Sequence, residues 1–178
     1  MPATFQVVQW VRDTYPRPQV AAEWLNDCYD WIVEEMNPDP STDLQRILDN
    51  IESQLLQSDL RDSMVPGTGL PHDISKYNGR RLQGQVLVEV TAITDIGHSA
   101  FSLQNVRQTR IDRADLAGLG QEDDEEEGPI PRYPRSMMRL ELSDGNVSVK
   151  AIEYRKLPEL ALGETPLGFK VSLLFTLL

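Results

Sequence analysis

The sequence has almost none of the residues that build disulfides, metal centres or nucleophilic catalytic sites. Cys28 is the only cysteine, so no disulfide can form within the chain, and without a second Cys or a His beside it we expect an inert buried thiol. His72 and His98 are the only histidines, and both fall in irregular segments. Neither a metal-ligand cluster nor a Ser-His-Asp triad can be assembled from them. We therefore predict that the chain is not an enzyme and has no cofactor and no metal.

Long apolar runs and a secretory start are also absent. No apolar stretch approaches the roughly 20 residues that a membrane-spanning helix needs. The N-terminus MPATFQVVQW lacks the basic start and the apolar run of a secretory signal. With the single cysteine, these absences predict a soluble protein of the nucleus or cytoplasm that makes no contact with a membrane.

Positive charge is scarce. The chain has 17 Lys and Arg residues against 28 Asp and Glu residues, which gives a net charge of −11. Because nucleic-acid affinity comes largely from Lys and Arg that neutralise phosphates, this balance disfavours a protein that grips DNA alone. Six acids form the uninterrupted run Glu122 to Glu127. A solvated, mobile spacer is the favoured interpretation of this run, and the alternative is a charged contact for a basic partner or a mimic that repels DNA.

The first 62 residues predict a three-helix bundle. Tyr15-Pro16 follows the first helical segment, and Pro38 and Pro40 end the second. Amphipathic helices in succession can bury their apolar stripes only against one another. We expect Trp24 and Trp31 to pack in this core, with a partner-facing patch as the alternative. The residues at helical spacing are Phe5, Val8 and Val11; Val20, Trp24, Leu25, Cys28, Trp31, Ile32 and Met36; and Leu44, Ile47, Leu48, Ile51, Leu55 and Leu56.

Residues 63–83 predict an inter-domain connection, because Pro, Gly and Asn accumulate there and no period survives. Residues 84–178 then predict a small β-barrel. A first strand runs to about Thr94, with Val86, Val88 and Val90 alternating.

A hairpin follows in SMMRLELSDGNVSVKAIEY, with Asp144-Gly145 at its turn. The apolar positions change parity at Ile152 and Tyr154, which predicts a bulge that bends the strand. Between the two strands lies an insertion of residues 95–135, far longer than a hairpin loop of roughly 2 to 5 residues.

Several segments together resemble the RecQ-mediated genome instability protein 1 family, over about residues 7–171. They are VAAEWLNDCYDWIVEE, LLQSDLRDSM, GLPHDI, LQGQVLVEVTAITDIGHSAFSLQNVR, MMRLELSDGNVSVKAIEYRKLP and PLGFK. The resemblance implies an α+β fold, in which a three-helix bundle precedes an OB-fold barrel with a long insertion between strands 1 and 2. A tudor-domain-containing partner of a type IA topoisomerase shares this region and is the lesser match.

The resemblance also implies a function. It is that of a nuclear, non-catalytic scaffold subunit that binds topoisomerase III and a RecQ-family helicase in double Holliday junction dissolution. In that scheme the barrel packs on the topoisomerase and the insertion reaches its gate, while DNA is contacted mainly through the complex. The residues expected to contact a partner are Phe101, Leu103, Ile130, Pro131 and Tyr133 of the insertion and Lys170 of the barrel.

The C-terminal end of the chain departs from this scheme. An OB-fold barrel has five strands, yet the chain ends in VSLLFTLL, where we expect a fourth strand, so the barrel is predicted to be incomplete through truncation or a mispredicted gene end. The alternative function is an OB-fold module that binds single-stranded nucleic acid directly. The strands disfavour it, because they carry few aromatics and we expect Glu89, Glu141 and Glu153 to face outward.

Overall fold

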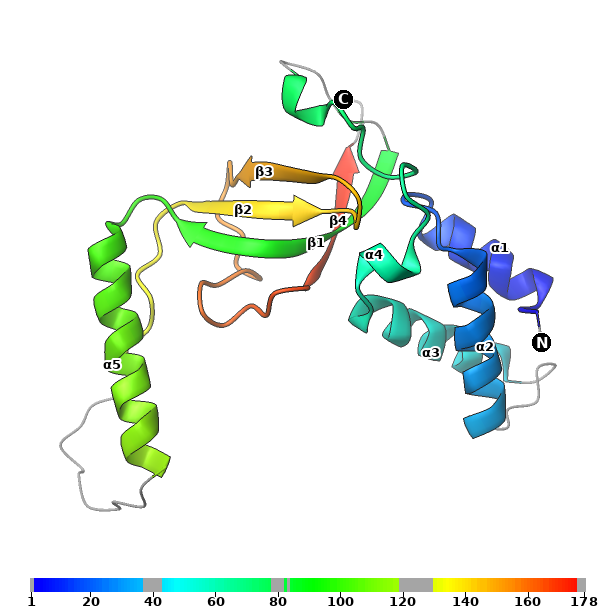
Figure 1. The fold of residues 1–178 in the computed structure, drawn as a ribbon, viewed down its shortest axis with the longest axis horizontal. Coiled ribbons are helices and arrows are strands. Elements are labelled where there is room, and N and C mark those ends of the chain that lie inside the picture. Colours follow the sequence, from blue (N-terminus) through cyan, green and yellow to red (C-terminus); the bar gives the residue numbers. More distant parts are fainter. Residues whose placement is uncertain (1, 37–42, 78–81, 83, 119–129, 176–178) are drawn as a thin grey trace. The chain divides into compact units, whose positions relative to one another are not determined.

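The computed structural model describes residues 2–36, 43–77, 82, 84–118 and 130–175, which fold into N-terminal helices followed by an antiparallel sheet (Figure 1). The α+β fold class predicted from the sequence is confirmed. In chain order the elements are α1 (Phe5–Thr14), α2 (Ala22–Met36), α3 (Leu44–Gln57), α4 (Leu60–Ser63), the short 3-10 helix η1 (Ile74–Lys76), β1 (Gly84–Asp95), α5 (Ala100–Gly118), β2 (Met138–Ser143), β3 (Ser148–Ile152) and β4 (Lys170–Phe175).

Backbone contacts divide the chain into two compact units. The first unit comprises residues 1–92, 141–151 and 167–178, and the second unit comprises residues 93–140 and 152–166. The segment predicted as a connection between domains includes Met64 and Leu70, both buried. Domain boundaries at residues 62 and 84 stay a prediction.

The helices α1, α2 and α3 of the first unit share an apolar core. Its buried members are Val7, Val11, Leu25, Tyr29, Ile32, Ile47, Leu48 and Ile51. The predicted helices are confirmed, and Trp24 packs partly buried against this core as expected. Trp31 does not, since 49% of its surface is exposed. The buried stripe of α2 runs through Tyr29 and Ile32, and each residue turns the helix by about 100°, which carries Trp31 off that stripe.

The thiol of Cys28 is partly buried beside the same core. Burial raises the pKa of Cys28 to about 11. A thiol with such a pKa stays protonated at neutral pH and is a poor nucleophile.

A second apolar cluster joins the helices to the sheet within the first unit. It contains Tyr15, Leu55, Leu60, Met64 and Leu87. Because Leu87 lies between Val86 and Val88 on β1, the strand is buried on both faces over this stretch. The face of β1 that the sequence pattern assigns to solvent is therefore covered by helices.

The sheet has the strand order β3-β2-β1-β4 in the described part of the chain. Strands β1 and β4 are antiparallel, with a register that runs from Gly84 opposite Phe175 to Glu89 opposite Lys170. The predicted hairpin of β2 and β3 is confirmed. Its turn contains Gly145 with a φ of +91°, a left-handed conformation that favours glycine.

The hairpin turn packs against α4, also within the first unit. A Cβ atom at Gly145 would lie 2.5 Å from the carbonyl carbon of Leu60, so only glycine fits there. The carboxylate of Asp144 accepts a hydrogen bond of 2.6 Å from the Leu70 amide. The turn is thereby fixed to the helical part of this unit.

The bulge predicted after β3 is not present. Ile152 and Tyr154 are 59% and 94% exposed, so these two apolar residues face solvent. Glu153, between them, turns inward, and its amide donates to the Met138 carbonyl at 3.0 Å. Inward and outward side chains therefore keep alternating along the strand, and Glu153 occupies an inward position.

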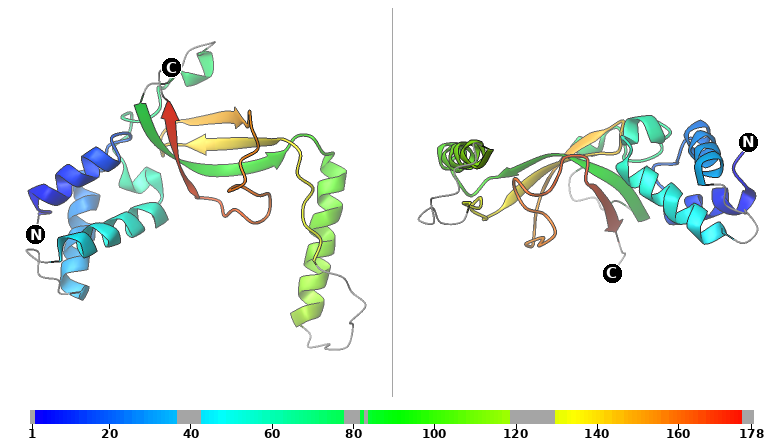
Figure 2. Two further views of the ribbon diagram at one scale, coloured as in Figure 1. Left: turned by 180° about the vertical axis from the view of Figure 1, so that it is seen from behind. Right: turned by 90° about the horizontal axis from the view of Figure 1, so that it is seen from below.

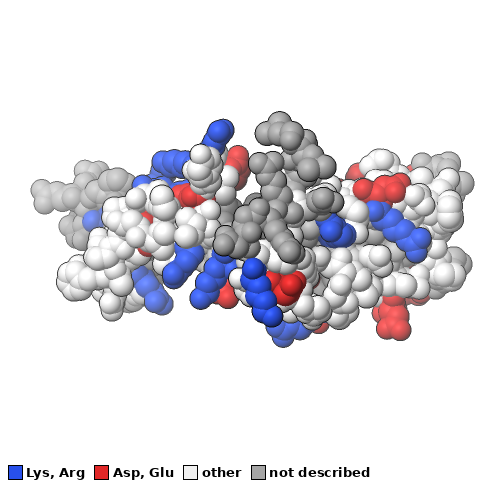
Figure 3. Space-filling view, turned by 90° about the horizontal axis from the view of Figure 1, so that it is seen from above, with Lys and Arg blue, Asp and Glu red and all other residues white. Residues whose placement is uncertain are grey.

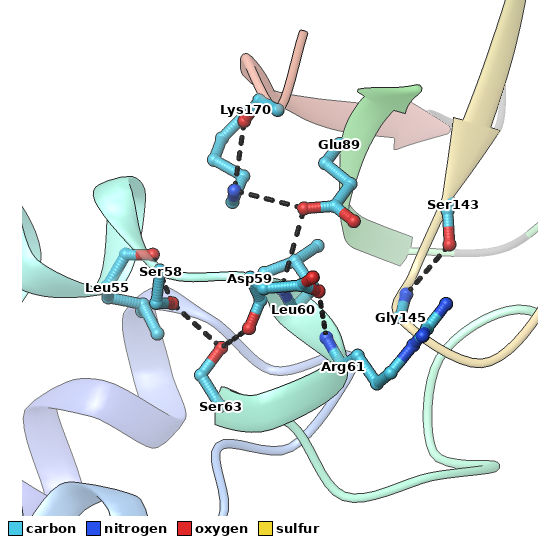
Figure 4. Close-up of polar contacts among 11 residues, drawn as sticks. Leu55, Ser58, Asp59, Leu60, Arg61, Ser63, Glu89, Ser143, Gly145 and Lys170 are labelled. Atoms are coloured by element: carbon cyan, nitrogen blue, oxygen red, sulfur yellow. Dashed lines mark hydrogen bonds and ion pairs between the residues drawn. The ribbon is translucent and has the colours of Figure 1, made fainter. Parts of the chain in front are cut away.

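Glu89 does not face outward either. Its Oε2 atom accepts hydrogen bonds from Lys170 Nζ at 3.1 Å and from the Leu60 amide at 3.4 Å (Figure 4). The side chain of Lys170 is only 5% exposed. A buried carboxylate needs a countercharge, and Lys170 provides it from the neighbouring strand.

Candidate protein-binding site

The insertion between β1 and β2 contains the helix α5, which the sequence pattern did not predict. Its apolar residues Phe101, Leu103, Val106 and Ile111 are spread around the helix and form no stripe. The helix starts after Ser99, whose hydroxyl oxygen accepts from the Ser102 amide at 3.1 Å. The start of α5 is therefore indicated by the hydrogen bond of its N-terminal capping residue, Ser99, and not by the spacing of its apolar residues.

Residues 130–136 run beside α5, as the two views agree (Figures 1 and 2). Arg110 of α5 holds this segment: its NH1 atom donates to the Pro131 carbonyl at 3.0 Å. The guanidinium carbon of the same side chain lies 5.3 Å from the centre of the Tyr133 ring. Arg110 thus orients two of the residues predicted to contact a partner.

The structure brings two of the predicted residues together and leaves two others exposed. Leu103 and Tyr133 are half-buried and line one cavity of about 400 Å³. Phe101 and Ile130 are 73% and 57% exposed. The other residues lining the cavity are Ile93, Thr94, Gln104, Arg107, Leu162 and Gly163.

Lys170, the remaining predicted contact, belongs to the first unit. Its ammonium group is bound to Glu89 inside that unit. A contact between Lys170 and a partner stays a prediction.

The two ends of the insertion are tied down by buried acids of the second unit. Asp95 accepts from the Ser136 amide at 2.6 Å and from the Gly97 amide at 2.8 Å. Burial opposes ionisation of Asp95, but these backbone hydrogen bonds outweigh it and lower its pKa. Hydrogen bonds therefore join the residues at which the insertion begins and ends, and we call these residues the base of the insertion.

Glu153 also holds the base of the insertion, because it forms a bidentate ion pair with Arg135. Arg135 NH2 donates to Glu153 Oε2 at 2.6 Å, and NH1 donates to Oε1. The hydrogen bonds from Arg135 lower the pKa of Glu153 to about 2, against the opposing effect of burial. The guanidinium of Arg135 is therefore bound within the second unit.

Phe101 and Ile130 expose apolar surface on this insertion. Among the described residues, no three His, Cys, Asp or Glu side chains come together as a set of metal ligands. No helix in the described ranges is long and apolar enough to cross a membrane. Exposed apolar side chains on an insertion with a fixed base are suited to bury surface on another protein.

N-terminal helices followed by a four-stranded antiparallel sheet, with a long insertion after the first strand, define an α+β protein whose sheet is consistent with an OB-fold. Residues 11–63 match the family described as "RMI1, N-terminal helical domain", and residues 70–176 match "RMI1, N-terminal OB-fold domain". The chain belongs to the RMI1 family, whose members are non-catalytic subunits of a protein complex.

Three curated relatives are similar along nearly the whole chain, and each is named RecQ-mediated genome instability protein 1. The protein from Danio rerio is 32% identical over 94% of this chain, and that from Xenopus laevis is 30% identical over 94%. The Mus musculus protein is 29% identical over 95%. The matches span only 31%, 29% and 26% of these relatives' own lengths.

Proposed function

We propose that this chain is a scaffold subunit in the nucleus, in a complex of topoisomerase III and a RecQ-family helicase. In this role it stabilises and stimulates the topoisomerase during double Holliday junction dissolution. The name of the relatives, RecQ-mediated genome instability protein 1, supports the link to RecQ. The observation that carries the proposal is the pair of exposed apolar residues, Phe101 and Ile130, on an insertion with a fixed base.

We also propose a division of labour between the sheet and the insertion. The OB-fold sheet packs on the topoisomerase, and the insertion reaches its gate. Removing apolar surface from water is worth roughly 25 cal/mol per Å², so Phe101 and Ile130 contribute affinity only when a partner covers them. Since Asp95 and Glu153 hold the base, α5 can contact a moving partner without unfolding the sheet.

The test is to replace residues 99–131 with a Gly-Asn turn, which keeps Asp95, Arg135 and Glu153. We expect the sheet to fold, topoisomerase III binding to weaken, and stimulation of decatenation to be lost. Binding is measured by pull-down and calorimetry, and decatenation by gel assay. Full stimulation by the shortened protein would show that the insertion is a bystander.

A direct contact with nucleic acid is the second candidate function. Its support is a set of exposed cations in the second unit, Arg107, Arg132, Arg139, Arg155 and Lys156. Figure 3 shows Lys and Arg side chains close together on one face, with acidic side chains among them. Because the net charge is −11, we expect weak binding of single-stranded DNA at physiological salt and DNA contact mainly through the complex. Submicromolar affinity in fluorescence anisotropy would favour this second candidate.

A further inference from the structure

Two cavities of the second unit lie on either side of a shared wall. The larger, of about 400 Å³, contains Leu103 and Arg107 in its lining, and the smaller, of about 190 Å³, contains Arg132 and Lys156. Tyr133 and Leu162 line both cavities. We call the two cavities and this wall the Tyr133 groove.

The wall of the Tyr133 groove is held in place before any partner arrives. Arg110 lies over the Tyr133 ring, and Gly163 lies against the ring edge. A Cβ atom at Gly163 would be 2.3 Å from Cε2 of Tyr133, and the φ of +77° at this position also favours glycine. The Tyr133 ring therefore occupies space that any other residue at position 163 would fill.

The rim of the groove is positive although the chain as a whole is acidic. Arg107, Arg132 and Lys156 are exposed, and within the part of the chain that the structure describes their side chains make no hydrogen bond or ion pair. Arg135 also lines the smaller cavity, but its charge is balanced by Glu153. Among the described lining residues, Glu164 is the single acid.

We propose that the Tyr133 groove binds an acidic peptide segment that carries one bulky apolar side chain. The apolar side chain enters the larger cavity between Leu103 and Tyr133, and neighbouring carboxylates pair with Arg107, Arg132 and Lys156. This proposal rests on the proposed function, because it assigns the peptide to a partner protein of the complex.

The groove fits a peptide better than a nucleic acid. Bases bind by stacking on an open aromatic face, and Arg110 already covers one face of the Tyr133 ring. Strong binding of a phosphate backbone needs several cations in a row, and the rim offers three free ones on two separate cavities. A peptide with an acidic side chain beside an apolar one can pair with the cations of the rim and fill the larger cavity.

The first experiment compares two triple variants with the same change of charge. The groove variant is R107E/R132E/K156E, and the control is R139E/K150E/R155E, which reverses three exposed cations that do not line either cavity. We expect the groove variant to lose about tenfold or more of its affinity for topoisomerase III, and the control to change less than about threefold. If wild type binds and the two variants weaken equally, the groove proposal is wrong while the proposed function stands.

The second experiment needs no topoisomerase. A random peptide library displayed on phage is selected on the full chain, and recovered peptides are tested against the groove variant. We expect sequences with Asp and Glu around one Leu, Phe or Trp, and loss of their binding to the groove variant. Recovered peptides that bind the groove variant as well as wild type would overturn the proposal. So would displacement of bound peptide by single-stranded DNA, which would assign the rim to nucleic acid.

The two experiments separate the two proposals. If wild type fails to bind topoisomerase III, the proposed function is wrong and the peptide selection alone decides the groove. Thermal unfolding of each variant checks that the fold is retained. The neutral variant R107Q/R132Q/K156Q repeats the test without introducing new negative charge, and it should lose the same peptides.

Discussion

Helices α3 and α5 both carry apolar side chains, but they use them differently. In α3, Ile47, Leu48, Ile51 and Leu55 are buried on one face. In α5, none of the residues from 100 to 114 is buried, and Phe101 is largely exposed. Apolar burial holds α3 in place, whereas a few polar contacts hold α5. The bundle thus uses its apolar surface for stability, whereas much of the apolar surface of α5 is exposed and, under the proposed function, contacts a partner.

The largest expected effect comes from a matched pair of isoleucines. Ile51 is fully buried in α3, and Ile111 is 41% exposed in α5. We expect Ile51→Ala to lower the free energy of unfolding by about 4 kcal/mol and Ile111→Ala to change it by less than about 0.5 kcal/mol. Urea unfolding followed by circular dichroism measures both. Similar losses at the two positions would remove the distinction between the helices.

A somewhat smaller loss is expected at the base of the insertion. Arg135→Met leaves the Glu153 carboxylate buried without its partner, which should cost about 2–3 kcal/mol, less than for a fully buried pair because Arg135 is 17% exposed. The measurement is urea unfolding of the variant. As a control, Arg155→Met removes an exposed cation and should change the stability very little. If Arg135→Met left the free energy of unfolding unchanged, the ion pair would not be needed to hold the base of the insertion.

The same ion pair predicts a dependence on pH. The pKa of Glu153 is lowered from 4.5 to about 2 in the folded state, so its ionised form stabilises the fold above the unfolded pKa. That stabilisation is lost as the pH falls from about 4.5 to about 2. Thermal melting across this range should fall less steeply for Glu153→Gln than for wild type.

The smallest effect is expected where α5 meets residues 130–136. Arg110→Met removes the cation over Tyr133 and the hydrogen bond to Pro131, which together should be worth about 1 kcal/mol. The loss should be local. Hydrogen exchange should therefore speed up in α5 and stay unchanged in α3, and faster exchange in both helices would contradict local anchoring.

The parts of the fold that the sequence predicts are those with a regular pattern. The apolar spacing of α2 and α3 predicts their helices, and the alternation in residues 138–142 predicts β2. The sequence pattern does not predict helix α5, because its apolar residues follow no helical period. Alternation also misplaces Glu89, since it cannot show that helices cover the second face of β1.

For the candidate site, composition predicts Phe101 and Ile130 as apolar residues in an insertion, and the structure finds both exposed. It does not predict Arg110 or Gly163, which orient Tyr133 from distant positions in the chain. The ion pair of Glu153 with Arg135 joins residues 18 positions apart. Such pairings depend on tertiary structure and leave no periodic signal in the sequence.

The central claim, that the exposed apolar residues of the insertion bind a partner, is tested most directly with two phenylalanines. Phe5 of α1 is 81% exposed and Phe101 of α5 is 73% exposed, so neither Phe5→Ala nor Phe101→Ala should change the melting temperature much. Calorimetry with topoisomerase III should show a loss of about tenfold in affinity for Phe101→Ala and no loss for Phe5→Ala. Unchanged affinity for Phe101→Ala, or an equal loss for Phe5→Ala, would contradict the account.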